Sequence, residues 1–352
     1  MKASKIFIKW IAISLVIQVS IYFYLDHFYF STGGNIKITE GKSLYQKKEI
    51  KPNVTVADDC SDISLSSDCS YTAYFQNGVV KVVDTNTGKA RGNLNFGQGI
   101  QCLAYKWIPD SDRMIIAEKL HTDTGRFIRF YSYDAENQRK EEVKEYSTQK
   151  SDSIIALAGS NEKVDMAMST LTNVMYSKVL YSSGLSAIYR IDANETMTKV
   201  VTAVKRIGKI GVASRDDQLV YEDLINSKVR TNTKSRVITI NGNSKLKLVG
   251  TDDDDNIYVG SAIGNGKVNK IFYGNLSQSM NTWKSINLNL ASSTDNLKVM
   301  PNGKIYLIDH INNNIKEIKS GQTINYSGTF VGIYDDGIVS IDNSKLKLEN
   351  VK

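Results

Sequence analysis

The sequence predicts an all-β protein: a single β-propeller of seven four-stranded blades, preceded by one N-terminal transmembrane helix. From about residue 60, short runs of Ile, Val, Tyr, Leu and Thr alternate with Gly, Asn and Asp, and amphipathic helical periodicity is almost absent. One strand–turn–strand motif recurs through this region. Its copies are spaced by about 45 residues on average, which is the four-strand period of a propeller blade. Six or eight blades are the alternatives.

The repeated motif is a short strand, a turn of Asp, Asn, Ser or Gly, and a second strand of apolar residues. Two clear copies are "KWIPDSDRMIIAE" at 106–118 and "KVMPNGKIYLIDH" at 298–310. A second polar turn follows each copy, as in "VVDTNTGK", and two turns per period predict a four-stranded meander. The approximate centres of the first turn are Cys69, Ser111, Asn161, Asp216, Asp254, Asn302 and Asp336.

These turns divide the chain into seven predicted blades. The last block contains only three strand-like runs, so we expect residues 36–57 to supply the missing strand and close the ring, which would remove its exposed edges. The run at 244–250 fits either the outer strand of one blade or the inner strand of the next. The expected blades are 60–98, 100–149, 151–203, 204–248, 249–292, 294–327 and 328–352.

The N-terminus predicts a membrane anchor. The apolar run that ends at Leu25 reaches the roughly 20 residues that a bilayer-spanning helix needs. Lys2, Lys5 and Lys9 precede it, so the positive-inside rule places the N-terminus in the cytoplasm and the body outside. Bulky aromatics follow the run in place of a small-residue cleavage site, which favours an uncleaved anchor over a cleaved signal peptide. The expected domains are 1–30, a cytoplasmic tip and signal anchor; 31–59, a linker with the ring-closing strand; and 60–352, the propeller.

Charge and cysteine content restrict the function classes. The net charge of +7 is mild, and for an extracytoplasmic body it makes an anionic polymer a possible partner and nucleic acid a poor one. The three cysteines are too few for a disulfide scaffold. A Cys60–Cys69 disulfide and unpaired cysteines remain equally open, and this composition suits a bacterial cell surface.

The stretch 106–118 resembles the Trp-x-Pro-Asp-Gly element of dipeptidyl-peptidase-type, TolB-type and WD-like propellers, with Ser111 in place of the glycine. The stretch 298–310 is similar to the corresponding element of NHL-like propellers. The resemblance covers residues 60–352 and implies the propeller superfold, without implying any one function.

The acidic run at Asp252–Asn256 is the one candidate for a metal site. Asp252, Asp254 and Asn256 place oxygen ligands at alternate positions, as a calcium loop does. The mid-loop glycine and the distant bidentate glutamate of such loops are missing, so an ordinary polar turn is the alternative, and the preferred one.

No catalytic constellation emerges from the sequence. His121, Asp123 and Arg126 fall in a predicted polar loop, and His310 ends a predicted strand. Thr282 and Trp283 resemble the end of a sialidase Asp box, but the Asp and Gly of that box are replaced by Gln278 and Met280. We therefore expect no cofactor and no enzymatic activity.

The expected function is a membrane-anchored, non-catalytic module of the cell envelope that binds a protein partner through its loops. The alternative is a carbohydrate-active or wall-polymer-processing enzyme on the same scaffold.

Overall fold

The computed structural model describes residues 2–24, 50–145, 154–169, 171–215, 217–233, 236–334 and 337–350. The chain forms two units, residues 1–49 and 50–352. The first contains α1 (Lys2–Tyr24), so the predicted helix is confirmed. In the described part of the chain, however, no helix combines the length and the apolarity that a membrane crossing requires.

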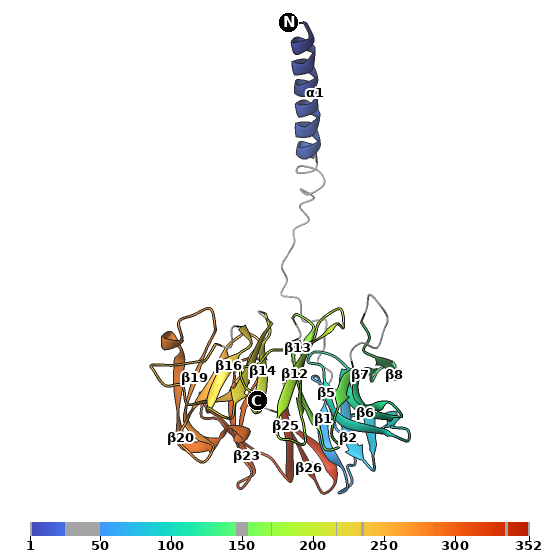
Figure 1. The fold of residues 1–352 in the computed structure, drawn as a ribbon, viewed down its shortest axis with the longest axis vertical. Coiled ribbons are helices and arrows are strands. Elements are labelled where there is room, and N and C mark those ends of the chain that lie inside the picture. The colour runs from blue at the N-terminus through green and yellow to red at the C-terminus, as the bar shows by residue number, and fades with distance from the viewer. Residues whose placement is uncertain are drawn as a thin grey trace. The chain divides into compact units, whose positions relative to one another are not determined.

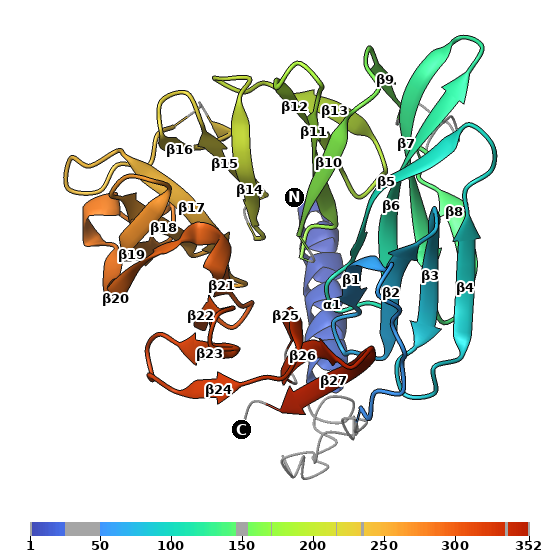
Figure 2. The same ribbon diagram turned by 90° about the horizontal axis from the view of Figure 1, so that it is seen from below.

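The second unit is a ring of seven sheets, as Figure 2 shows, and this confirms the predicted propeller. In every blade the sheet order follows chain order, so consecutive strands pair antiparallel. The first strands of six of the seven neighbouring blade pairs contact one another, which makes the first strands the inner strands of the ring. We call the strands of a blade a to d from the inside outward. The blades can be followed by colour in Figure 1.

The strand bounds are as follows. Blade 1 is β1 (Ser61–Leu65), β2 (Tyr71–Gln76), β3 (Val79–Asp84) and β4 (Ala90–Asn95); blade 2 is β5 (Ile100–Trp107), β6 (Arg113–Thr122), β7 (Gly125–Asp134) and β8 (Arg139–Glu142), with β9 (Ile155–Leu157) also paired to β7; blade 3 is β10 (Lys163–Ser169), β11 (Val174–Leu180), β12 (Ser186–Ile191) and β13 (Met197–Val200). Blade 4 is β14 (Ile207–Ala213), β15 (Gln218–Asp223) and β16 (Lys228–Thr231); blade 5 is β17 (Leu246–Thr251), β18 (Ile257–Ala262), β19 (Lys267–Gly274) and β20 (Lys284–Ser293); blade 6 is β21 (Leu297–Val299), β22 (Ile305–Asp309), β23 (Asn314–Glu317) and β24 (Thr323–Asn325); blade 7 is β25 (Thr329–Tyr334), β26 (Gly337–Asp342) and β27 (Lys345–Asn350).

The turn between strands a and b repeats a backbone conformation as well as a sequence pattern. Among the described residues, this turn contains a residue with positive φ in six blades, and Asn, Asp and Gly tolerate that conformation better than most residues. In "KWIPDSDRMIIAE" this residue is Asp110, with φ of 54°. The six residues are Cys69, Asp110, Asn173, Asp217, Asp255 and Gly303.

The structure corrects two strand assignments. Asn161, predicted as the turn centre of blade 3, precedes the inner strand β10, and the a–b turn of that blade contains Asn173. The cause is an added segment: residues 155–157 pair with β7 and so belong to blade 2. The ambiguous run at 244–250 mostly forms β17, the inner strand of blade 5, which leaves blade 4 with three strands and an isolated bridge between Arg230 and Val237.

Residues 50–57 complete blade 7. Thr55 forms a bridge with Lys345, and two main-chain hydrogen bonds flank it, from Val56 N to Ser344 O and from Leu346 N to Val54 O. Val54 and Val56 are buried, while Thr55 between them is exposed. The proposed donor segment thus pairs with the outer strand β27; its first part, 36–49, lies outside the described residues.

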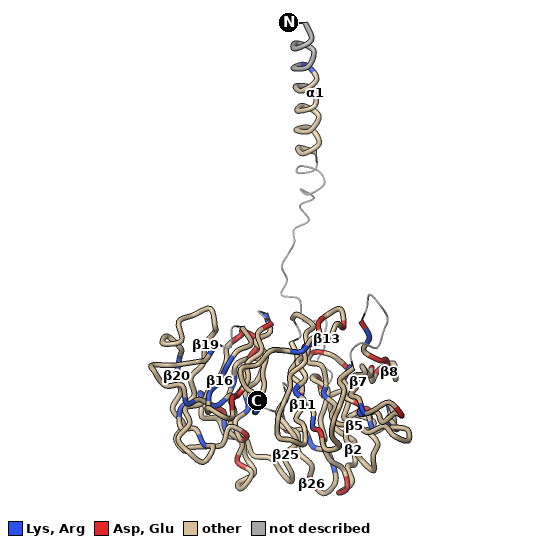
Figure 3. Tube along the Cα trace, in the orientation of Figure 1, with Lys and Arg blue, Asp and Glu red and all other residues tan. Residues whose placement is uncertain are grey.

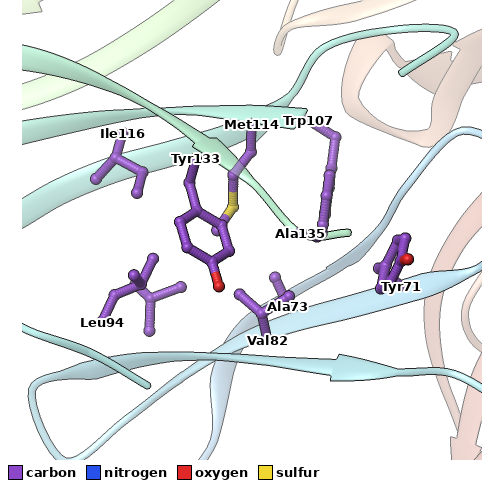
Figure 4. Close-up of a cluster of buried hydrophobic side chains, with 10 residues drawn as sticks. Tyr71, Ala73, Val82, Leu94, Trp107, Met114, Ile116, Tyr133 and Ala135 are labelled. Carbon is purple, nitrogen blue, oxygen red and sulfur yellow. The ribbon is translucent and has the colours of Figure 1, made fainter. Parts of the chain in front are cut away.

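The core lies between adjacent blades, and Figure 4 shows the cluster that joins blades 1 and 2. Tyr71 stacks on Trp107 with ring centroids 6.5 Å apart. The hydroxyl of Tyr133 donates to the carbonyl oxygen of Arg91 at 2.5 Å, so this buried ring has a partner for its polar end. Each large side chain buried this way contributes about 1.5–3 kcal/mol, and seven such clusters hold the ring together.

Candidate functional site

The acidic run at 252–256 is organised as a turn. One carboxylate oxygen of Asp252 accepts from the main-chain N–H groups of Asp254 and Asn256, at 3.0 and 2.8 Å. The other accepts from the Asn256 amide at 2.9 Å and from the Tyr258 hydroxyl at 2.7 Å. Four donors therefore occupy the carboxylate that a cation would need.

Two further acidic groups of this turn face blade 4. Asp255 accepts from the main-chain N–H of Arg215 at 2.9 Å, and exposed Asp254 pairs with the Arg215 guanidinium at 3.2 Å. Within the described ranges, no group of three or more His, Cys, Asp or Glu side chains is placed to hold a metal ion. The cation hypothesis for Asp252, Asp254 and Asn256 thus gains no support, and the observed hydrogen bonds fit the alternative of an ordinary turn.

The other polar candidates do not come together. His121 pairs in register with Arg126 at the tip of the β6–β7 hairpin, so these residues continue the strands and only the turn between them is a loop. The Arg126 guanidinium donates to Gly159 O at 2.8 Å, which ties the hairpin to the segment before blade 3. His310 packs edge-on against Phe330 at 5.8 Å. Trp283 is buried, and its indole N–H donates to Asn275 O at 3.2 Å, a structural role.

None of the three cysteines is disulfide-bonded. Cys69 is buried in the first a–b turn, and Cys60 and Cys102 are half-buried. Burial raises the pKa of Cys102 to about 12, with a smaller contribution from Glu118, so its thiol stays protonated at neutral pH.

Two features that the sequence reasoning missed stand out. The first is a set of exposed apolar side chains on one face of the ring. Because all blades share one strand order, the b–c and d–a connections emerge on the same face, opposite the a–b turns. We call the set the b–c face cluster; it extends over the consecutive blades 3 to 6, and β20 contributes its member from an outer strand. Its residues are Leu185, Val201, Leu224, Ile225, Ile263, Leu290 and Ile311.

The second feature is a set of lysines on inner strands. Lys106 on β5, Lys209 on β14 and Lys298 on β21 come from the alternate blades 2, 4 and 6. The ammonium of Lys106 donates to Met166 O and that of Lys209 to Val249 O, in each case on the inner strand of the following blade. We call these three residues the axial lysines. Elsewhere on the ring, basic and acidic residues are interspersed, as Figure 3 shows.

Comparisons with known proteins confirm the fold. No family model matches the chain. No curated protein matches it either. Among solved structures, an oligogalacturonate lyase in complex with manganese is similar over 86% of this chain and 90% of its own, with a TM-score of 0.52 and 12% identity. A prolyl endopeptidase is similar over 81% of this chain and 46% of its own, with a TM-score of 0.50 and 12% identity.

A chain of a mitotic checkpoint complex is similar over 86% of this chain and 94% of its own, with a TM-score of 0.49 and 15% identity. At these identities the oligogalacturonate lyase and the prolyl endopeptidase show similarity of the fold alone. The ring of seven sheets defines this protein as a β-propeller.

Proposed function

We propose that this propeller is a non-catalytic binding module that engages a protein partner through its b–c face. The observation that carries the proposal is the b–c face cluster. Ile311 is 93% exposed, Val201 86% and Ile225 62%. Large apolar side chains in water are costly unless another surface covers them, and here they recur on one face of four consecutive blades. We take this recurrence on a single face as the mark of an interaction surface.

The opposite face provides a matched control. Leu171, in the a–b turn of blade 3, is 60% exposed. We compare the double variant Ile225→Asp/Ile311→Asp with Leu171→Asp. All three sites are exposed, so neither variant should alter the melting temperature by more than surface changes usually do.

The experiment is a pull-down from membranes of the source cells with the full chain as bait. We expect one stoichiometric partner with the wild type and with Leu171→Asp, and its loss with the double variant. Retention of the partner by the double variant, or the absence of any stoichiometric partner, contradicts the proposal.

A membrane anchor at the cell envelope is a further part of the proposal and is supported by the sequence. Trp10, Leu15, Val16 and Val19 of α1 are each more than half exposed. Exposed large apolar side chains on a helix favour an apolar environment. Recovery of the full chain in the membrane fraction, with the propeller cleaved by protease added to intact cells, is the expected result; recovery in the soluble fraction contradicts this part.

The alternative is a carbohydrate-active or wall-polymer-processing enzyme, since one scaffold can carry unrelated functions and one solved structure of similar fold is a lyase. A glycosidase on this scaffold would need two carboxylates across a cleft. The exposed apolar residues of the b–c face favour the binding function, which is therefore the preferred proposal.

A further inference from the structure

The axial lysines come from strands that surround the ring axis. β5, β14 and β21 are the first strands of alternate blades, so the three lysines lie on strands that surround the axis. Lys106 and Lys298 are nevertheless exposed to water. Because these two residues are exposed although their strands are the innermost, a solute can reach them from the axis or from its mouth.

The hydrogen bonds place two of the ammonium groups at a similar height. We compare positions along the ring axis by counting residues from the end of each inner strand. Lys106 lies one residue before the end of β5, and its Nζ donates to Met166 O, three residues before the end of β10. Lys209 lies four residues before the end of β14, and its Nζ bonds Val249, two residues before the end of β17. The two side chains thus extend in opposite directions along the axis, and their ammonium groups lie at similar positions, three and two residues before the ends of the strands that they contact.

The charges of the other axial lysines act on Lys106 and Lys209. Desolvation is the main cause that lowers the pKa of Lys106; Asp165 raises it, and Lys298 and Lys209 lower it. For Lys209, desolvation again comes first and Lys298 follows. For Lys298, desolvation alone lowers the pKa, and among the described residues its ammonium has no hydrogen-bond or ion-pair partner in the structure.

The acidic groups nearby have other partners. Asp165 pairs with Lys178 at 3.3 Å. The two carboxylate oxygens of Glu222 accept from the main-chain N–H groups of Leu248, at 2.8 Å, and of Lys209, at 3.0 Å. Asp295 accepts from the Ser293 hydroxyl at 3.4 Å. Each ammonium has three donors, and Lys106 and Lys209 each show one bond, so most of the donors at the axis are unused.

We propose that the axial lysines Lys106, Lys209 and Lys298 form a binding site for a polyvalent oxyanion of the phosphate class. Such an anion accepts several charge-assisted hydrogen bonds at once and relieves the repulsion among the three ammonium groups. A monovalent anion cannot satisfy three cations that approach from different blades. The site shares no residue with the b–c face cluster, so this proposal does not depend on the proposed protein partner.

The test is isothermal titration calorimetry of the purified full chain with inorganic pyrophosphate, with phosphate and with acetate. We expect saturable binding of pyrophosphate, weaker binding of phosphate and none of acetate. Loss of one charge-assisted contact in Lys298→Met should weaken pyrophosphate binding by about tenfold or more. Lys106→Met/Lys298→Met should abolish it.

The control is Lys284→Met. Lys284 is exposed on the outer strand β20, so its removal changes the net charge equally without touching the axis. Thermal melts establish that each variant is folded, and Lys298→Gln replaces Lys298→Met if the latter is not. No saturable binding by the wild type, unchanged binding by the Lys298 variant, or an equal loss in Lys284→Met overturns the proposal.

Discussion

The ammonium nitrogen of Lys119 lies 2.6 Å from the Oε2 atom of Glu162, in an ion pair that is buried on both sides. The same ammonium donates to Ser160 O at 2.7 Å. Lys119 belongs to β6 of blade 2, and Glu162 immediately precedes β10 of blade 3. The pair therefore fixes the segment that leads from one blade into the next.

Glu162→Ala should lower the free energy of unfolding by about 3–5 kcal/mol, because it leaves the ammonium of Lys119 buried without its counter-charge. The control is Glu141→Ala, which removes the exposed pair between Arg139 and Glu141 at 3.1 Å and should cost less than about 1 kcal/mol. Urea denaturation of both variants measures the difference. Equal small losses would show that the buried pair does not hold this segment.

The same pair predicts a pH dependence. Burial by itself raises the pKa of Glu162, but hydrogen bonds from Lys119 and from the main chain outweigh it and hold the pKa below the ordinary value of 4.5. Because the folded-state pKa is the lower one, the contribution to stability is present above pH 4.5 and is lost as the pH falls through the folded-state value. The gap in melting temperature between wild type and Glu162→Ala should therefore narrow in acid; a constant gap would contradict this.

Ring closure can be tested within one short segment. Val56→Asp places a carboxylate among the side chains that join blades 7 and 1, including Leu65, Val339 and Leu346, and should cost several kcal/mol or unfold the ring. Thr55→Asp changes the adjacent, solvent-facing position and should be within about 0.5 kcal/mol of the wild type. Thermal melts of the two variants distinguish a closing strand from a passive linker, since similar melts would exclude the closing role.

The fold was predictable because the blades repeat the same types of turn residue, which can be recognised in the sequence, as at Asp110 and Gly303. Blade 3 was misplaced because "GSNEK" has the composition of a turn, although pairing of β9 with β7 places it outside the a–b hairpin. The axial lysines were missed for another reason. A lysine within an apolar strand, as in "AYKWI" and "IGKIGV", was the available signal, but which strands are innermost and where the ammonium groups converge follow only from the closed ring.

The carboxylates at 252–256 have two interpretations, an ordinary hydrogen-bonded turn and a cation site, and these predict different effects of substitution. Asp252→Ala removes the acceptor of four hydrogen bonds beside the buried Tyr258 and should cost about 2–4 kcal/mol. Asp254→Ala removes only an exposed ion pair and should cost less than about 1 kcal/mol. Added calcium should leave all three melting temperatures unchanged. A calcium-dependent rise in the wild type that both variants lose would restore the cation site.

The cysteines should differ in reactivity toward a thiol reagent at mildly alkaline pH. Burial raises the pKa of Cys102 to about 12, so almost none of it is thiolate, and Cys69 is fully buried. Cys60 is half-buried and lies just before β1 rather than within a strand, although desolvation also raises its pKa. We expect the fast phase of labelling in the native protein to disappear in Cys60→Ser and to persist in Cys102→Ser, with all three thiols reacting after denaturation. A fast phase that depends on Cys102 would contradict this order of reactivity. It would show that β5, the strand that also carries Lys106, opens on the time scale of labelling.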